Sequence, residues 1–322
     1  MRIVRRRGGV LVAVVAETQL ARWEIRHGRF QRSMAVIAGF AAVVSGFEAY
    51  VQHLRGAFDH WLMWTPVGLA PAVVVSAAAA VVSERAARLL LPLVSLVALV
   101  DGLVGFVYHL RGIRRLPGGF KLGQYNVVMG PPVFAPLLVG MVGVLGTIAA
   151  FLRRERRPNQ LLEAVAAPQV AAAAVGASLR PLRRTEVEMA EGRFQQGLAV
   201  LAAVFAVLSG GEAYFEHLRG SFNRRLMWTP VWITPPMVAA GLGAARSRRV
   251  AVRVLPLVSV VTFLDGMLGF LLHLQGIKRM PGGSTTLRFD LMLGPPLFAP
   301  LLFCAVGLLG MIASVLRREE SR

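Results

Sequence analysis

The chain has 322 residues, of which 55% are hydrophobic, and it carries a formal net charge of +19 with one cysteine. This hydrophobic share exceeds what a soluble domain of this size needs. The lone Cys304 excludes an intrachain disulfide and a cysteine-ligated cluster. The basic residues form no stripe with interleaved aromatic side chains, so we expect no nucleic acid partner.

The first 32 residues form a basic segment with a short apolar run after Arg7. The basic start and small-residue end are similar to a signal peptide, but the run is brief, so we expect an uncleaved segment at the membrane interface. Eight apolar blocks follow, at roughly 33–53, 62–83, 90–110, 129–151, 196–217, 226–245, 254–274 and 292–315. A helix needs about 20 such residues to cross the hydrocarbon core. The blocks do not alternate as barrel strands do, so they predict an all-α integral membrane protein with eight transmembrane helices.

The blocks belong to a sequence repeat. Residues 28–152 recur at 192–316 with a constant offset of 164; MWTP, for example, stands at 63–66 and again at 227–230. Within each half, HLRG or HLQG ends the odd-numbered blocks and a proline-marked restart follows. A fixed period of this length predicts two tandem four-helix repeats, each built from two similar helix hairpins. The predicted domains are a basic N-terminal segment at 1–32, repeat one at 33–152, a linker at 153–191, repeat two at 192–316 and a tail at 317–322.

The basic residues predict the orientation of these helices. If both termini, the linker and the loops after the second and sixth blocks share one side, that side holds 25 of the 36 lysines and arginines. The positive-inside rule then places both termini in the cytoplasm, so we expect a multi-pass protein of the inner membrane with the lipid bilayer as a partner. The second half alone has the same bias. The Ala-rich stretch within 153–191 is therefore predicted to be a cytoplasmic linker, and the two repeats should run parallel.

Four histidines occupy equivalent places at the outer ends of the odd-numbered blocks: His53, His109, His217 and His273. Glycine or alanine stands four and seven residues before each histidine, on the same helix face. Arg55, Arg111 and Arg219 follow two residues after the first three, and Gln275 follows the fourth. This pattern favours haem b between paired histidines, with small residues beside the macrocycle and arginines near its propionates. The same pattern is also typical of capped helix C-termini and of closely packed membrane helices.

Four acids lie deeper in the same blocks. Glu48 and Glu212 should lie about 7.5 Å below the histidines of their helices, and Asp101 and Asp265 about 12 Å below theirs. An acid near mid-membrane is costly and often marks a proton or ion pathway. The alternative is a protonated carboxyl that is hydrogen-bonded to a neighbouring helix. A dinuclear metal site is disfavoured, because Glu and His five residues apart point about 140° apart on a helix.

Three functions are compatible with these residues. The first is a redox subunit that holds haem b and passes electrons between a quinone and a partner subunit at the outer face or in the membrane. The second is a proton- or ion-coupled transporter that uses the membrane acids. The third is a structural or assembly subunit without a cofactor. We favour the first, because helix capping does not explain why all four positions are histidine.

Overall fold

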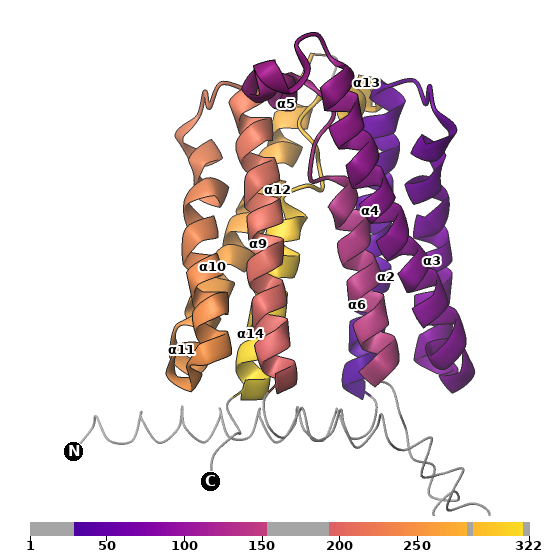
Figure 1. Ribbon diagram of the computed structural model, residues 1–322, viewed down its shortest axis with the longest axis vertical. Helices are drawn as coiled ribbons and strands as arrows, with labels where there is room; N and C mark the ends of the chain where they lie inside the picture. The colour runs from indigo at the N-terminus through magenta and orange to yellow at the C-terminus, as the bar shows by residue number, and fades with distance from the viewer. Residues whose placement is uncertain (1–28, 153–192, 282–285, 318–322) are drawn as a thin grey trace, which may run out of the picture.

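The computed structural model describes residues 29–152, 193–281 and 286–317 (Figure 1). These residues form helices joined by turns and irregular segments, and they include no strand. The chain is therefore all-helical in its described part, as predicted. The N-terminal segment and the central linker fall mainly outside the described residues, so the predictions for them are not addressed by the structure.

The helix boundaries recur in the two halves of the chain. The first half contains α2 (Arg29–Arg55), η1 (Trp61–Trp64), α3 (Thr65–Val82), η2 (Ala86–Leu90), α4 (Leu91–Arg115), η3 (Gly119–Leu122), α5 (Gly123–Met129) and α6 (Pro136–Leu152). The second half contains α9 (Arg193–Arg219), η4 (Arg225–Trp228), α10 (Thr229–Arg246), α11 (Arg248–Arg253), α12 (Leu255–Lys278), α13 (Leu287–Leu293) and α14 (Leu301–Arg317). Helices α2, α3, α4 and α5 each begin 164 residues before α9, α10, α12 and α13.

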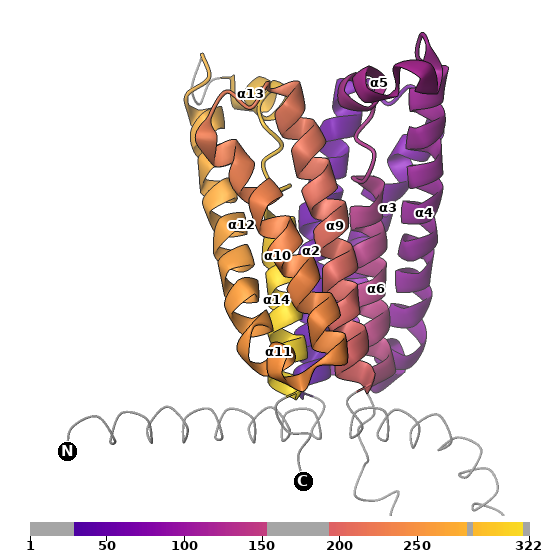
Figure 2. The same cartoon turned by 60° about the vertical axis from the view of Figure 1, so that its left-hand side comes forward.

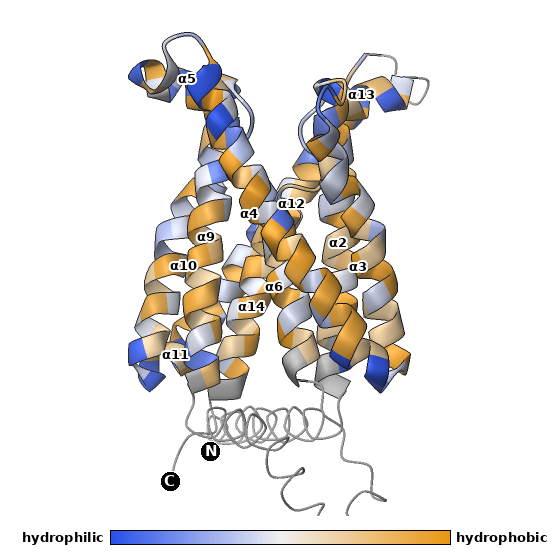
Figure 3. Cartoon of the chain, turned by 45° about the vertical axis from the view of Figure 1, so that its right-hand side comes forward, coloured by the Kyte–Doolittle hydropathy of each residue, from blue (hydrophilic) through white to orange (hydrophobic). Residues whose placement is uncertain are grey.

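Five of the helical segments are long and apolar enough to cross a membrane: Met34–Arg55, Trp61–Val82, Ala86–Arg115, Phe194–Arg219 and Leu255–Lys278. Many of their large apolar side chains are exposed, as on α4 and α12, where lipid would cover them. Figure 3 shows these helices as largely hydrophobic over their length. The chain is therefore a multi-pass membrane protein. Two further apolar helices, at Pro136–Ala150 and Leu301–Val315, are shorter.

The fourth and eighth apolar blocks do not form full-length helices. The block at 129–151 becomes helical only from Pro136, and the block at 292–315 only from Leu301. Prolines cause this delay, because Pro131 and Pro132 donate no backbone hydrogen bond and disfavour helix in the residue before them. Pro136 occupies the first helical position, where proline is tolerated, so it starts α6 and does not kink it. Seventeen residues of helix span only about 25 Å.

We call residues 130–135 and 294–300 the entry segments, because each leads from a short helix at one end of the molecule into its middle. Helices α5 and α13 both lie at this end, and α11 lies at the opposite end (Figures 1 and 2). The two halves share one core near the α11 end, where α2 and α6 pack close to α9 and α14. Its buried members include Met34, Met141, Leu198 and Val306.

Candidate functional site

The four histidines form two pairs, each within one half of the chain. The ring centroids of His53 and His109 are 6.5 Å apart, and those of His217 and His273 are 6.4 Å apart. Both pairs have nearly perpendicular rings, at 76° and 75°. The pairs thus join α2 to α4 and α9 to α12 near the α5 and α13 end, an arrangement that the sequence alone did not specify.

Backbone carbonyls fix the orientation of three of these rings. Nδ1 of His109 lies 2.5 Å from the carbonyl oxygen of Pro132, and Nδ1 of His273 lies 2.6 Å from that of Pro296. Nδ1 of His217 lies 2.6 Å from the carbonyl oxygen of Met227. A carbonyl oxygen accepts only, so Nδ1 carries the proton and Nε2 is left as an acceptor or metal ligand. His109 and His273 therefore also hold the two entry segments in place.

The glycine strips below the histidines are filled by protein. A Cβ atom added to Gly102 would lie 2.5 Å from the backbone nitrogen of Gly140, and one added to Gly105 would lie 2.9 Å from Cβ of Pro136. In the second half, Gly266 and Gly269 contact Cys304 and Pro300 in the same way. These glycines allow close packing of α4 on α6 and of α12 on α14. The residues on these strips do not leave the space beside a macrocycle that the haem hypothesis requires.

The structure contradicts the capping interpretation at two of the four HLRG and HLQG glycines. Gly112 and Gly276 lie inside α4 and α12, where each contacts a proline of the adjacent entry segment. Gly56 and Gly220 come directly after their helices, but neither has a positive φ angle. The left-handed residues are instead Ala57, Phe58, Ser221 and Phe222, with φ between 46° and 56°. Non-glycine residues rarely adopt this conformation, and here the ring of Phe58 stacks on Trp64 at 3.9 Å, as Phe222 does on Trp228.

Arg55 and Arg219 reach across to the opposite half of the chain. Arg219 on α9 donates from Nε to the carbonyl oxygen of Val128 and from a terminal nitrogen to that of Gly130, both at 2.7 Å. Arg55 on α2 donates to the carbonyl oxygens of Met292 and Gly294, the latter at 2.6 Å. Each guanidinium thus binds two carbonyls where a helix ends and an entry segment begins. These hydrogen bonds take the donors that the haem hypothesis assigned to propionates, while Arg111 lies exposed on α4.

Glu48 and Glu212 bind the same entry segments a little deeper. The carboxylate of Glu212 accepts a hydrogen bond of 2.7 Å from the backbone N–H of Phe134, and Glu48 accepts one of 3.1 Å from the N–H of Phe298. Both side chains are buried, with exposed fractions of 8% and 7%. The two N–H groups stand just before α6 and α14, where a helix leaves its first donors without intrahelical partners. Each half therefore caps the broken helix of the other half with a carboxylate.

Beside these interhalf contacts, one position differs in chemistry between the two halves. In the first half, Gln52 donates to Glu48 at 2.8 Å and accepts from Arg55 at 3.0 Å. The equivalent residue in the second half is Glu216, which forms an ion pair of 3.1 Å with Arg219. Glu216 also interacts electrostatically with Arg55 of the other half. We call these six side chains the interhalf cluster: Glu48, Gln52, Arg55, Glu212, Glu216 and Arg219.

The two membrane aspartates have a different environment. Asp101 on α4 accepts a hydrogen bond of 2.5 Å from the hydroxyl of Thr65, which begins α3. Asp265 interacts in the same way with Thr229, the first residue of α10. Both aspartates are half-buried and lie outside the interhalf cluster. The predicted hydrogen bond to a neighbouring helix is therefore present at both positions.

The structure brings together the glutamates and two of the arginines that the sequence singled out, and it separates them from the aspartates. Sequence reasoning missed Gln52, Glu216 and the backbone of the entry segments. Two features of the sequence pointed to them: Glu216 stands where the first repeat has Gln52, and paired prolines stand at 131–132 and 295–296. Among the described residues, no group of three or more His, Cys, Asp or Glu side chains is arranged to hold a metal ion.

Comparison with known proteins yields no relative from which a role could be transferred. No family model matches the chain, and no curated protein or solved structure matches it significantly. The geometry of the interhalf cluster and of the histidine pairs is therefore the basis for assigning a function.

Proposed function

We propose that this protein is a proton- or ion-coupled membrane transporter or conduit whose site is the interhalf cluster. The observation that carries the proposal is the reciprocal contact between halves, in which a buried glutamate of each half caps a broken helix of the other. Secondary transporters commonly bind substrates and coupling ions at the interface of two repeats, beside discontinuous helices. Non-helical backbone at membrane depth is tolerated only where protein buries it or where it lines a cavity.

Protonation of the glutamates couples chemistry to movement in this proposal. An ionised carboxylate accepts strong, charge-assisted hydrogen bonds, and a protonated carboxyl is a weaker acceptor. A proton that binds Glu48 or Glu212 therefore weakens the hold of one half on the entry segment of the other. Glu216 adds a third acid between Arg55 and Arg219, and Asp101 and Asp265 extend the series of acids within each half.

The proposal includes eight membrane crossings in two parallel repeats. In the fourth and eighth crossings, an entry segment and a short helix together provide the length that 17 helical residues lack. The beginning of α2 and the end of α14 lie at the same end of the described structure (Figure 1), as an even number of crossings requires. We further propose, from the distribution of basic residues, that this end faces the cytoplasm and that the membrane is the inner membrane.

Proton flux into proteoliposomes tests the transport proposal. An internal pH dye should report flux in vesicles that contain the full-length protein under an imposed potential. The combined changes Glu48→Gln and Glu212→Gln should lower this flux to less than about a tenth, which corresponds to about 1.4 kcal/mol in the barrier. Asp101→Asn with Asp265→Asn should also reduce it. Glu84→Gln, which alters an exposed ion pair with Arg88 near the opposite end, is the matched control. Equal flux in all these proteins and in empty vesicles would contradict the proposal.

The second candidate is a redox subunit with haem b and a quinone, together with partner subunits. The paired imidazoles favour it, because carbonyls hold Nδ1 and leave Nε2 available for a metal. When bound, haem supplies one-electron chemistry. Because the glycine strips leave no slot, we derive no electron-transfer step through it.

An absorption spectrum separates this candidate from the first. If haem b is bound, the dithionite-reduced protein should show a shifted Soret band with sharp α and β bands, and His109→Ala should lose them while still inserting in the membrane. A featureless spectrum from protein that was expressed with a haem supply eliminates the redox function. A featureless spectrum together with no flux would favour the structural subunit.

A further inference from the structure

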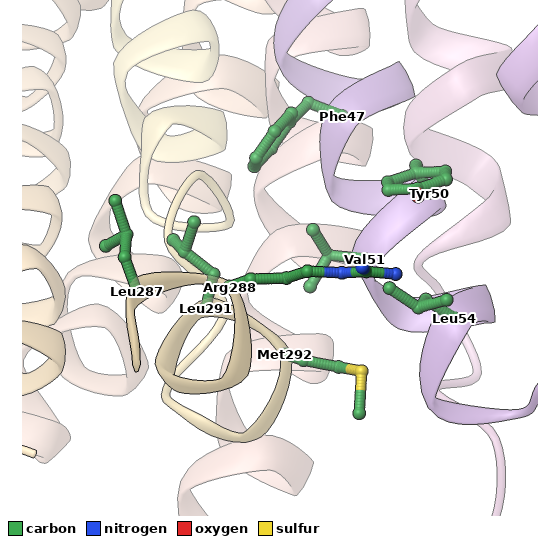
Figure 4. Close-up of a pocket in the computed structure, with 8 residues that line it drawn as sticks. All are labelled: Phe47, Tyr50, Val51, Leu54, Leu287, Arg288, Leu291 and Met292. Atoms are coloured by element: carbon green, nitrogen blue, oxygen red, sulfur yellow. The ribbon is translucent and has the colours of Figure 1, made fainter. Parts of the chain in front are cut away.

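A cavity of about 320 Å³ lies between the two halves of the chain, where α13 crosses the side of α2 (Figure 4). Phe47, Val51 and Leu54 of α2 form one wall, and Leu287 and Leu291 of α13 form the other. Arg288 is the charged side chain in this lining. In Figure 4 it extends from α13 towards α2, across the space between the walls. This cavity, which we call the groove, therefore combines an apolar interior with one cation.

Duplication of the sequence does not account for this chemistry. The residues equivalent to Leu287 and Arg288 in the first half are Gly123 and Gln124, and the residue equivalent to Phe47 in the second half is Gly211. Both the cation and part of the apolar wall thus belong to this side of the molecule alone. A feature inherited only from the repeat would appear on both sides.

The charge of Arg288 is available to a ligand. Arg55, the nearest arginine on α2, is engaged by the carbonyls of Met292 and Gly294. Within the part of the chain that the structure describes, no ion pair involves Arg288, and its side chain is exposed. The groove lies at the ends of membrane helices, where head groups meet acyl chains. A guanidinium there favours a phosphate, which it binds through paired hydrogen bonds.

We propose that the groove holds one anionic phospholipid, with an acyl chain along α2 and its phosphate at Arg288. The apolar walls match a hydrocarbon chain, and the single cation matches a single negative head group. A neutral quinone would use the walls but would gain little from the arginine. The lipid would bridge the two halves beside the contacts that Arg55 makes, independently of any transport function.

Lipid counting on the purified full-length protein tests this inference. The protein is delipidated in detergent and titrated with phosphatidylglycerol or phosphatidylcholine, and native mass spectrometry reports the bound lipid. Wild type should bind one phosphatidylglycerol more tightly than phosphatidylcholine. Arg288→Gln should weaken the phosphatidylglycerol complex by about fivefold, the factor that one cation near an anionic head group contributes. Leu291→Trp should weaken it by filling the apolar part of the groove.

Arg279→Gln is the matched control. It removes an exposed arginine at the C-terminal end of α12, and this residue does not line the groove. It should bind phosphatidylglycerol as wild type does. The inference would be overturned by equal binding of the two lipids by wild type, by unchanged binding by Arg288→Gln, or by displacement of the lipid by menaquinone regardless of Arg288. Competition by soluble glycerol phosphate as effective as by the lipid would also overturn it, because the acyl chain would then contribute nothing.

Discussion

At the scale of single residues, the buried carboxylates of Glu48 and Glu212 have two roles. The first role is structural: each carboxylate accepts a hydrogen bond from a backbone N–H at the start of a helix in the opposite half. The second is the proposed binding of a proton. An isolated buried charge is expensive, and a charge that is hydrogen-bonded and close to arginines is less so. Arg219 and Arg55 lie two turns further along the same helices. The proposed proton site is therefore also a structural contact, so stability and flux must be measured on the same variants.

Replacement of Glu212 should separate the hydrogen bond from the charge. Glu212→Ala leaves the N–H of Phe134 without its acceptor, which should cost about 1–3 kcal/mol of unfolding free energy. Glu212→Gln keeps an acceptor oxygen and should cost less. The measurement is thermal unfolding of the detergent-solubilised protein, followed by tryptophan fluorescence. Glu84→Gln should have almost no effect. If Glu212→Ala melts with wild type, the capping contact does not stabilise the fold.

The sequence predicted these residues better than it predicted their partners. The apolar blocks correctly placed Glu48 and His53 on one helix, and Glu212 and His217 on another. It could not show that the partner of Glu48 is a backbone N–H 250 residues away. Backbone donors have no signature in a sequence, because every residue except proline carries one. For the same reason, the carbonyls that bind Arg55 and Arg219 could not be foreseen.

At the scale of helices, the glycines decide how closely elements approach. The glycines and alanines four and seven residues before each histidine predicted a strip of small residues on each helix, but the sequence did not show which neighbouring residues pack against these strips. Hydrophobic blocks reveal that a segment prefers the membrane, and they do not reveal where within the block the helix begins. The prolines at 131, 132 and 136 carried that information for α6. They indicated a late start once their missing N–H groups were counted.

Gly102→Ala should force α4 and α6 apart. The added methyl group would lie 2.5 Å from the nitrogen of Gly140 and 2.8 Å from the carbonyl oxygen of Pro136, and backbone atoms cannot rotate away. Overpacking of this kind costs about 1–3 kcal/mol, so the thermal midpoint should fall. Gly68→Ala on α3 is the control, because its new Cβ atom meets nothing within 4 Å. A midpoint for Gly102→Ala that equals the Gly68→Ala value would show that the two helices do not pack this closely.

At the scale of the whole molecule, the two halves are joined by exchanged contacts as well as by the linker. The entry segment of each half receives an arginine and a glutamate from the other. The sequence repeat predicted two similar units and could not predict this exchange, because a repeat describes each unit and not the surface between them. The exchange gives the interface a polar layer near α5 and α13, above the shared apolar core near α11.

This arrangement predicts that the halves remain together when the chain is cut between them. A protease site placed between residues 153 and 192 of the full-length protein, with an affinity tag on one end, permits cleavage after purification. The untagged half should be retained with the tagged half in detergent. The combined changes Arg55→Ala and Arg219→Ala remove four hydrogen bonds to carbonyls, two in the last turns of α5 and α13 and two at the start of the entry segments. Each is worth about 1.5–3 kcal/mol when the donor is charged, so the double change should release a measurable part of the untagged half. Arg246→Ala, at the C-terminal end of α10 and away from the entry segments, should not release the untagged half.

Full dissociation of the cleaved wild type would mean that the linker alone joins the halves, and it would remove the interface on which the proposed transport site depends.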